Sequence, residues 1–161
     1  MSTIHAPERE ALRIPGPAPR VLLIQAPYYD QVVGGMRNGA AATFAAAGAS
    51  MDVVDVAGGY ELPAALRMAL TQKASHYDGD LLLGCVVKGE TDHYTFICDA
   101  ISHGVMGISA ETGAAIGFGL LTVDTLEQAI ARSSDDKHNK GAEAAHALLM
   151  QVALRRRWGI Q

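Results

Sequence analysis

The segment Gly89-Glu90-Thr91-Asp92-His93 brings together residue types that can bind an anion and move a proton. It follows the apolar run Leu81–Val87 and precedes apolar residues at helical spacing, so we expect a strand-to-helix corner here. The start of a helix offers unpaired N–H groups and the positive end of the helix dipole, which suits a phosphate. Gly89 would let the backbone approach that phosphate closely, and the Thr91 hydroxyl could cap the helix or donate to the anion. His93 adds an imidazole, the side chain that most often performs general acid–base catalysis.

The same residues would also occur in an ordinary capped helix that exposes a histidine, and the pattern alone leaves both interpretations open. Two nucleotide-binding motifs can be excluded. A phosphate-binding P-loop needs a longer glycine-spaced run that ends in Lys-Ser or Lys-Thr. The stretch Gly117-Phe118-Gly119 lacks the third glycine of a dinucleotide-binding fingerprint.

Strand-like and helix-like segments alternate along the chain from about residue 20. The expected strands are 21–25, 52–56, 81–87 and 114–121. The expected helices are 30–48, one that begins at Glu61, one that contains Tyr94 to Val105, one capped by Thr125 and Gln128 that ends near Arg132, and 141–157. This alternation predicts a three-layer α/β/α fold, a flavodoxin-like four-stranded parallel sheet with helices on both faces. Prolines at 15, 17 and 19 mark residues 1–18 as an N-terminal arm, and residues 19–161 are expected to form a single domain.

In such a sheet, ligands bind beyond the carboxyl ends of the strands, where the connecting loops converge. This rule selects four segments as candidate site elements. They are Pro27-Tyr28-Tyr29, Gly58-Gly59-Tyr60-Glu61, Lys88 to His93, and Gly117-Phe118-Gly119.

The chain is mildly acidic, with a formal net charge of −4, which argues against nucleic acid or an anionic membrane as a partner. Arg155-Arg156-Arg157, at the end of the last expected helix, is predicted to be solvated and to complement the helix dipole. Cys85 and Cys98 have no metal-ligand spacing, and both are expected to be small buried residues in a reducing compartment. The sequence shows no signal peptide and no apolar stretch long enough to cross a bilayer, so we expect a cytoplasmic protein.

Several motifs together resemble one enzyme family. The run Gly84-Cys85-Val86-Val87-Lys88-Gly89-Glu90-Thr91-Asp92-His93-Tyr94 is similar to the central motif of the 6,7-dimethyl-8-ribityllumazine synthases. Four further motifs occur in the family's order and spacing: Gly58-Gly59-Tyr60-Glu61-Leu62-Pro63, Phe118-Gly119-Leu120-Leu121-Thr122, Gln128-Ala129-Ile130-Ala131-Arg132 and Asn139-Lys140-Gly141. The resemblance extends from about residue 20 to the C-terminus. One of these motifs alone would say little, whereas five in register favour membership of the family.

The resemblance implies a condensation in riboflavin biosynthesis. The amine of 5-amino-6-ribitylaminouracil would attack 3,4-dihydroxy-2-butanone 4-phosphate to give an imine. Phosphate would then be eliminated, and the ring would close with loss of water to give 6,7-dimethyl-8-ribityllumazine. Such a reaction needs no metal and no organic cofactor, and much of the catalysis can come from holding two reactants together.

The resemblance also implies a role for each matching position. His93 would be the general acid/base, and Glu90, Thr91 and Arg132 would bind the butanone phosphate. Tyr28 would stack on the uracil ring. The remaining residues expected at the ribityl-uracil site are Gly59, Tyr60, Glu61, Cys85, Val86, Val87 and Phe118, with backbone groups serving at positions 85–87.

Family members work as homo-oligomers, and the resemblance implies that Phe118 and Arg132 come from a neighbouring subunit. The acidic stretch 133–138 replaces the glycine-containing linker common in shell-forming members, which favours an isolated pentamer over a 60-subunit shell. Riboflavin synthase is a further candidate partner. Pro27-Tyr28 stands where many relatives have an arginine followed by Phe or Trp, which keeps the ring but adds a hydroxyl. A flavin- or lumazine-binding module without turnover, and a purely structural shell subunit, remain alternatives at this stage.

Overall fold

The computed structural model describes residues 12–72 and 77–160, so residues 1–11 of the expected arm lie outside the described part. Within it, four parallel strands form one sheet in the order β2-β1-β3-β4. The strands are β1 (Arg20–Gln25), β2 (Ser50–Asp55), β3 (Gly79–Val87) and β4 (Ile116–Val123). The helices are α1 (Asp30–Ala46), α2 (Glu61–Thr71), α3 (His93–Thr112), α4 (Leu126–Ala131) and α5 (Lys140–Arg157), with a short 3-10 turn η2 at Pro27–Tyr29. The predicted fold class is confirmed.

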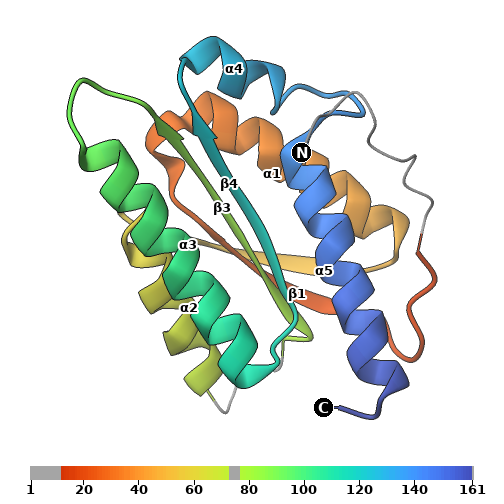
Figure 1. Cartoon of the computed structure of the whole chain (residues 1–161). Helices are drawn as coiled ribbons and strands as arrows, with labels where there is room; N and C mark the ends of the chain where they lie inside the picture. The colour runs from red at the N-terminus through yellow and green to blue at the C-terminus, as the bar shows by residue number, and fades with distance from the viewer. Residues whose placement is uncertain (1–11, 73–76, 161) are drawn as a thin grey trace.

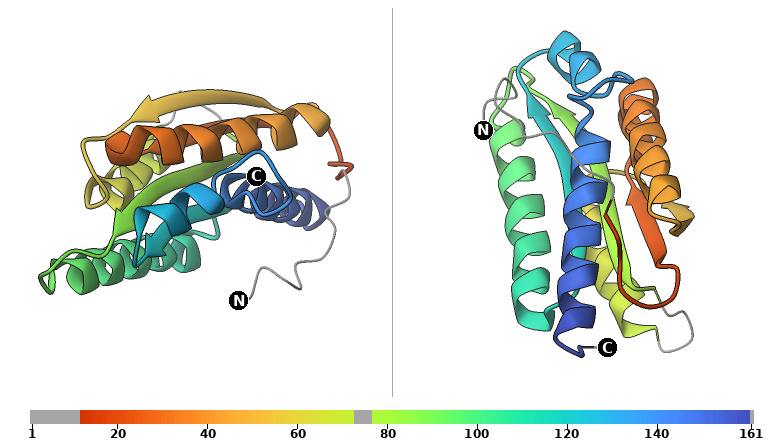
Figure 2. Two further views of the ribbon diagram at one scale, coloured as in Figure 1. Left: turned by 90° about the horizontal axis from the view of Figure 1, so that it is seen from above. Right: turned by 90° about the vertical axis from the view of Figure 1, so that its right-hand side faces the viewer.

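Helices cover both faces of the sheet, α1, α4 and α5 on one side and α2 and α3 on the other (Figures 1 and 2). The alternation of side chains along β3 explains this arrangement. Leu81 and Leu83 pack toward α1 and α5, whereas Leu82 packs toward α2 and α3. A strand buried on both faces needs apolar residues at every position, and this is why the run 81–87 is continuously apolar.

The many Ala and Gly residues of α1 reflect its close packing against α5. A Cβ added at Gly141, in the first turn of α5, would collide with the backbone of Met36. A Cβ at Gly39 would meet the side chain of Asn139, which caps α5 by accepting a hydrogen bond from the Ala142 N–H. The two helices can therefore approach only because these positions carry no side chain.

Predictions for one strand boundary and for one cysteine were wrong. The fourth strand runs from Ile116 to Val123, two residues later than predicted, because α3 extends to Thr112 and ends on Gly113 in the left-handed conformation. Cys85 is buried as expected, but Cys98 is only half-buried, because few positions of α3 are fully enclosed.

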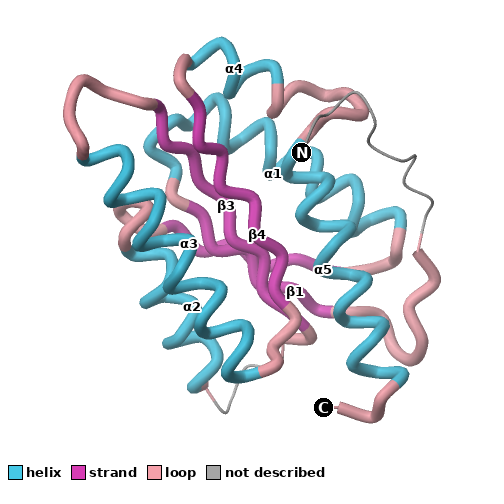
Figure 3. The backbone as a smooth tube through the Cα atoms, viewed as in Figure 1, coloured by secondary structure: helices cyan, strands magenta, loops and turns pink. Residues whose placement is uncertain are grey.

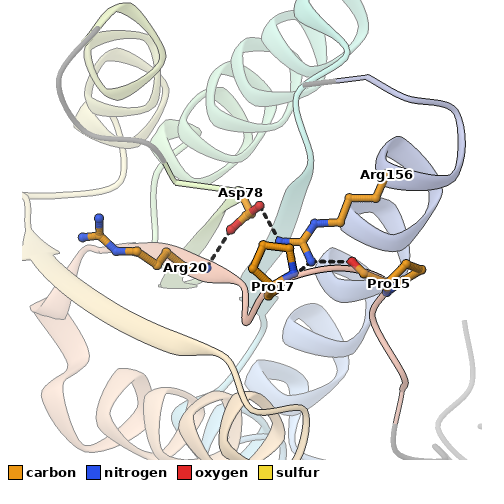
Figure 4. Close-up of polar contacts among 5 residues, drawn as sticks. All are labelled: Pro15, Pro17, Arg20, Asp78 and Arg156. Carbon is orange, nitrogen blue, oxygen red and sulfur yellow. Dashed lines mark hydrogen bonds and ion pairs between the residues drawn. The ribbon is translucent and has the colours of Figure 1, made fainter.

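At the amino end of the sheet, a polar network connects α5 with the segments that precede β1 and β3 (Figure 4). The sequence did not predict this network. Arg156 in α5 donates through Nη2 to the carboxylate of Asp78 at 2.7 Å. Through Nη1 it donates to the carbonyl oxygens of Pro15 and Pro17 at 2.6 and 2.7 Å. Asp78 also accepts a 2.8 Å hydrogen bond from the Arg20 backbone N–H. The prediction that Arg156 is a solvated arginine is thus wrong, because these partners leave its side chain only 17% exposed.

Replacing Arg156 by alanine is expected to lower the free energy of unfolding by about 2 kcal/mol, because several charge-assisted hydrogen bonds are lost at a half-buried site. It should also speed tryptic cleavage after the exposed Arg13, since the segment around Pro15 and Pro17 would lose its anchor. Urea denaturation and timed proteolysis measure the two effects. The control is Arg157→Ala, at an exposed position of the same turn. Equal stability of the two variants would show that the network contributes little.

Candidate functional site

Three of the four segments selected from the sequence lie directly after strands, at one end of the sheet. Pro27–Tyr29 forms η2 after β1, Gly58–Glu61 leads into α2, and Lys88–Asp92 joins β3 to α3. Figure 3 shows the loop after β3 at the same end of the sheet as α4. The fourth segment, Gly117–Gly119, was placed wrongly. It lies inside β4, where Phe118 pairs with Leu82 of β3.

The corner after β3 brings Tyr60 and His93 together. Their rings lie 5.8 Å apart between centroids at an interplanar angle of 61°, an edge-to-face contact. Tyr60 precedes α2 and His93 is the first residue of α3, so two separate loops meet at this point. The predicted site residues Tyr60 and His93 are therefore neighbours in space although 33 positions separate them in the chain.

The start of α3 is open to a ligand. Asp92 stands at the N-cap, but its side chain accepts no capping hydrogen bond from the first turn. Thr91 therefore does not cap the helix, and its hydroxyl stays exposed together with Gly89 and Glu90. A Cβ at Gly89 would meet nothing within 4 Å. Within this turn the Thr95 N–H donates to the Asp92 carbonyl oxygen at 3.0 Å. The N–H groups of His93 and Tyr94, with the Thr91 hydroxyl, are the ones that an anion could use.

The carboxyl end of β3 offers backbone groups as well. β1 pairs with β3 only as far as Leu83, whereas β4 pairs with it as far as Val87. The Leu83 carbonyl oxygen faces β1, where it accepts from the Ala26 N–H. By the alternation along a strand, the N–H and C=O groups of Cys85 and Val87 face the same side, beyond the end of β1. Those of Val86 face β4 instead.

The Cys85 side chain is a packing group. It is buried, and this burial raises the pKa of its thiol to about 11, so the thiol stays protonated at neutral pH. A protonated thiol is a poor nucleophile. The thiol is therefore poorly suited to chemistry, whereas the backbone of this position remains a candidate site group.

Three more predicted residues follow β1 and β2 at this end of the sheet. Tyr28 is 79% exposed and contacts Tyr29 edge to face at 5.1 Å, which leaves its ring free to stack on a planar ligand. Gly59 lies against α3, because a Cβ there would collide with the Ile101 side chain. Glu61 follows as the first residue of α2.

Phe118 and Arg132 line a different cavity, of about 400 Å³, along the edge of β4. Arg132 ends α4, and its Nη1 donates to the Gln128 carbonyl oxygen at 2.9 Å. Lys140 and Glu143 from α5 line the same cavity and form an ion pair at 2.6 Å. The sequence analysis missed both, although Lys140 stands inside one of the quoted motifs.

The predicted site residues thus form two groups in one chain. One surrounds the Tyr60–His93 contact at the start of α2 and α3. The other, with Phe118 and Arg132, lines a cavity between β4, α4 and α5 that includes neither Tyr60 nor His93. Within residues 12–72 and 77–160, no group of three His, Cys, Asp or Glu side chains could hold a metal ion. The same residues include no helix with the length and apolar character that a bilayer span requires.

Comparison with known proteins points to one family. The sequence profile described as 6,7-dimethyl-8-ribityllumazine synthase matches residues 18–156. A protein of that name from Paramagnetospirillum magneticum is 39% identical over 146 residues, which cover 88% of this chain and 97% of the relative. One from Nitrobacter winogradskyi is 38% identical over 156 residues, 95% of this chain and 94% of the relative. A 6,7-dimethyl-8-ribityllumazine synthase 1 from Rhizobium meliloti is 37% identical over 144 residues, 88% and 94% of the two chains.

These matches cover both groups of site residues, from Tyr28 to Arg132, and nearly the full length of the relatives. They agree with the parallel α/β/α fold and with the motifs at the strand ends. The chain belongs to the 6,7-dimethyl-8-ribityllumazine synthase family, a family of transferases in riboflavin biosynthesis.

Proposed function

We propose that the chain condenses 5-amino-6-ribitylaminouracil with 3,4-dihydroxy-2-butanone 4-phosphate. The products are 6,7-dimethyl-8-ribityllumazine, phosphate and water, in the penultimate step of riboflavin biosynthesis. Its family membership supports this reaction. The observation that carries the proposal is the contact between Tyr60 and His93 beside the uncapped start of α3. It combines a ring, a proton-transfer group and an anion site at one corner.

His93 acts as the general acid/base in this proposal. It donates a proton to the hydroxyl that leaves as water when the amine and the ketone form the imine. It then accepts a proton from the carbon skeleton as phosphate departs. The contact with Tyr60 restricts the position of the imidazole, and the exposure of His93 lets protons exchange with solvent between the two steps. The condensation requires no metal and no organic cofactor.

The pyrimidine binds on the side of the corner that faces β1. Tyr28 stacks on the uracil ring, since its own ring is exposed. Gly59, Tyr60 and Glu61 contact the ribityl chain and the ring edge. The backbone groups of Cys85 and Val87 supply hydrogen bonds where β3 extends past β1, with Val86 between them. Phe118 contributes a further aromatic ring to the pyrimidine site.

The butanone phosphate binds to the loop at Glu90 and Thr91, beside the first turn of α3, which Asp92 does not cap with its side chain. Arg132 supplies the counter-charge, because a guanidinium can bind a phosphate through two donors. Arg132 and Phe118 reach this site from a neighbouring copy of the chain. The separation of the two residue groups within one chain supports that arrangement.

We infer that the active form is a homo-oligomer, with a pentamer favoured over a 60-subunit shell. The stretch 133–138 carries Asp135, Asp136 and Lys137 in place of a small glycine-containing linker, which supports the smaller assembly. Riboflavin synthase is a candidate partner that would consume the product. Residues 19–161 are proposed as a single catalytic domain behind the arm 1–18. Both cysteines are free, in keeping with a reducing cytoplasmic compartment.

The direct test mixes the two substrates with the purified protein and follows lumazine formation by absorbance. We expect turnover far above the uncatalysed condensation, with one phosphate released for each lumazine formed. A rate equal to that of the uncatalysed reaction would refute the enzymatic function. Tight flavin binding without turnover would identify a binding module instead.

A further inference from the structure

Lys88 lies at the proposed phosphate corner but has no role in the function described so far. It follows the last residue of β3 directly, and its N–H donates to the Val123 carbonyl oxygen at 2.8 Å. The backbone of Lys88 is thereby fixed to the end of β4. Glu90 follows two residues later, a distance of at most about 7 Å even in an extended chain. A rigid backbone position therefore carries a flexible cationic side chain next to the loop.

This corner is acidic apart from Lys88. Glu90 and Asp92 lie in the loop, and Asp124 follows the neighbouring strand β4. All three carboxylates are exposed, as is Lys88. Between residues 84 and 95, Lys88 is the only lysine or arginine in the sequence. Without it, this loop would present a phosphate with carboxylates and no cationic side chain of its own, and like charges repel at this range.

The side chain of Lys88 is held only weakly. Its Nζ lies 3.9 Å from Oδ1 of Asp124, and the two side chains are 59% and 69% exposed. An exposed ion pair of this length contributes little free energy and is screened by salt. The backbone of Asp124 is fixed, because its N–H donates to the Gln128 side chain at 3.0 Å. Asp124 therefore pairs only loosely with Lys88 beside the corner, and a phosphate with a higher charge can compete for the lysine.

We propose that Lys88 determines the selectivity of this site for a phosphorylated substrate, and that Asp124 is its exchangeable partner until the phosphate arrives. This inference rests on the proposed function. The chain that supplies His93 then also supplies a cation of its own for the phosphate, in addition to the Arg132 of the neighbouring copy. Lys88 contributes to binding of the phosphate and takes no part in proton transfer. Its loss should affect KM for the phosphate substrate and spare kcat.

The test compares wild-type protein with Lys88→Gln, Lys88→Arg and Asp124→Asn at low and high salt. The control is Arg67→Gln, which removes the same charge from an exposed position in α2. We expect Lys88→Gln to raise KM for the butanone phosphate about five- to tenfold at low salt, since one cation near a phosphate is worth that much in water. KM for the pyrimidine and kcat should change less than twofold. Lys88→Arg should restore binding, and Asp124→Asn should lower KM about twofold.

The salt dependence separates charge from structure. In 0.5 M salt the difference between wild-type and Lys88→Gln protein should shrink, because screening weakens exposed charges. An unchanged KM in Lys88→Gln, or equal rises for both substrates, would overturn the proposal. If the wild-type protein makes no lumazine, the proposed function fails, and calorimetric binding of inorganic phosphate still tests Lys88. Weaker phosphate binding by Lys88→Gln than by Arg67→Gln supports the role, and equal binding overturns it.

Discussion

Replacing His93 by alanine is expected to lower kcat about 100-fold, because a positioned general acid/base contributes at least that much to proton-transfer steps. KM for both substrates should stay within about threefold of wild type. The physical reason is that His93 is an exposed residue at the start of α3, and its imidazole contacts the Tyr60 ring edge to face. Its loss removes proton transfer and leaves the anion corner and the stacking ring in place. The residual rate would reflect the binding of two reactants side by side.

Steady-state kinetics with each substrate varied in turn provide the measurement. The matched control is His103→Ala, since His103 lies on the same helix and its side chain is 81% exposed. That variant should retain wild-type kinetics. If His93→Ala and His103→Ala have the same kcat, His93 is not the acid/base. A change in KM alone would instead assign His93 to substrate binding.

Replacing Arg132 by alanine is expected to raise KM for the butanone phosphate about 100-fold and KM for the pyrimidine less than threefold. A guanidinium that binds phosphate through two charge-assisted hydrogen bonds contributes about 2–3 kcal/mol, which corresponds to this change in affinity. The fold should survive the substitution. Arg132 ends α4, and its side chain makes one hydrogen bond, to a carbonyl oxygen of the same helix.

Arg132→Lys refines this test, because lysine keeps the charge but cannot form the two parallel bonds. We expect it to recover part of the affinity. The control Arg67→Ala removes an exposed arginine of α2 and should leave both KM values unchanged. Equal increases in the two KM values for Arg132→Ala would contradict the assignment of Arg132 as the phosphate ligand.

The fold could be predicted because its determinants are local. The continuous apolar run 81–87 indicated a strand covered on both faces. The recurrence of Leu62, Leu66 and Leu70 indicated an apolar helix face, and the structure buries Leu62 and Leu66 fully and Leu70 partly. The Thr125–Gln128 capping box was also correct, since the Gln128 N–H donates to the Thr125 hydroxyl at 3.4 Å. Only the ends of elements were misjudged. Gly113 ends α3 late, and a pattern of apolar residues does not show where a helix stops.

The site was only partly predictable for a different reason. Gly89 to His93 are contiguous, so their types and spacing indicated an anion corner directly. Lys140 and Glu143 come into the cavity of Arg132 through the packing of α5 on β4, which no local pattern reveals. Arg156 is another such case, because its partners Pro15 and Asp78 lie 141 and 78 positions away. Contacts of this kind depend on the three-dimensional fold.

The central claim is that one active site takes His93 from one chain and Arg132 from its neighbour. Mixed oligomers of His93→Ala and Arg132→Ala chains, formed by co-expression, test it most directly at low butanone phosphate. In a ring of head-to-tail contacts, about a quarter of the sites in a random equimolar mixture would combine two intact residues. We predict that the mixture recovers about a quarter of the wild-type kcat/KM, far above either variant alone. Activity no greater than the average of the two variants would show that each site lies within a single chain, and would contradict this account.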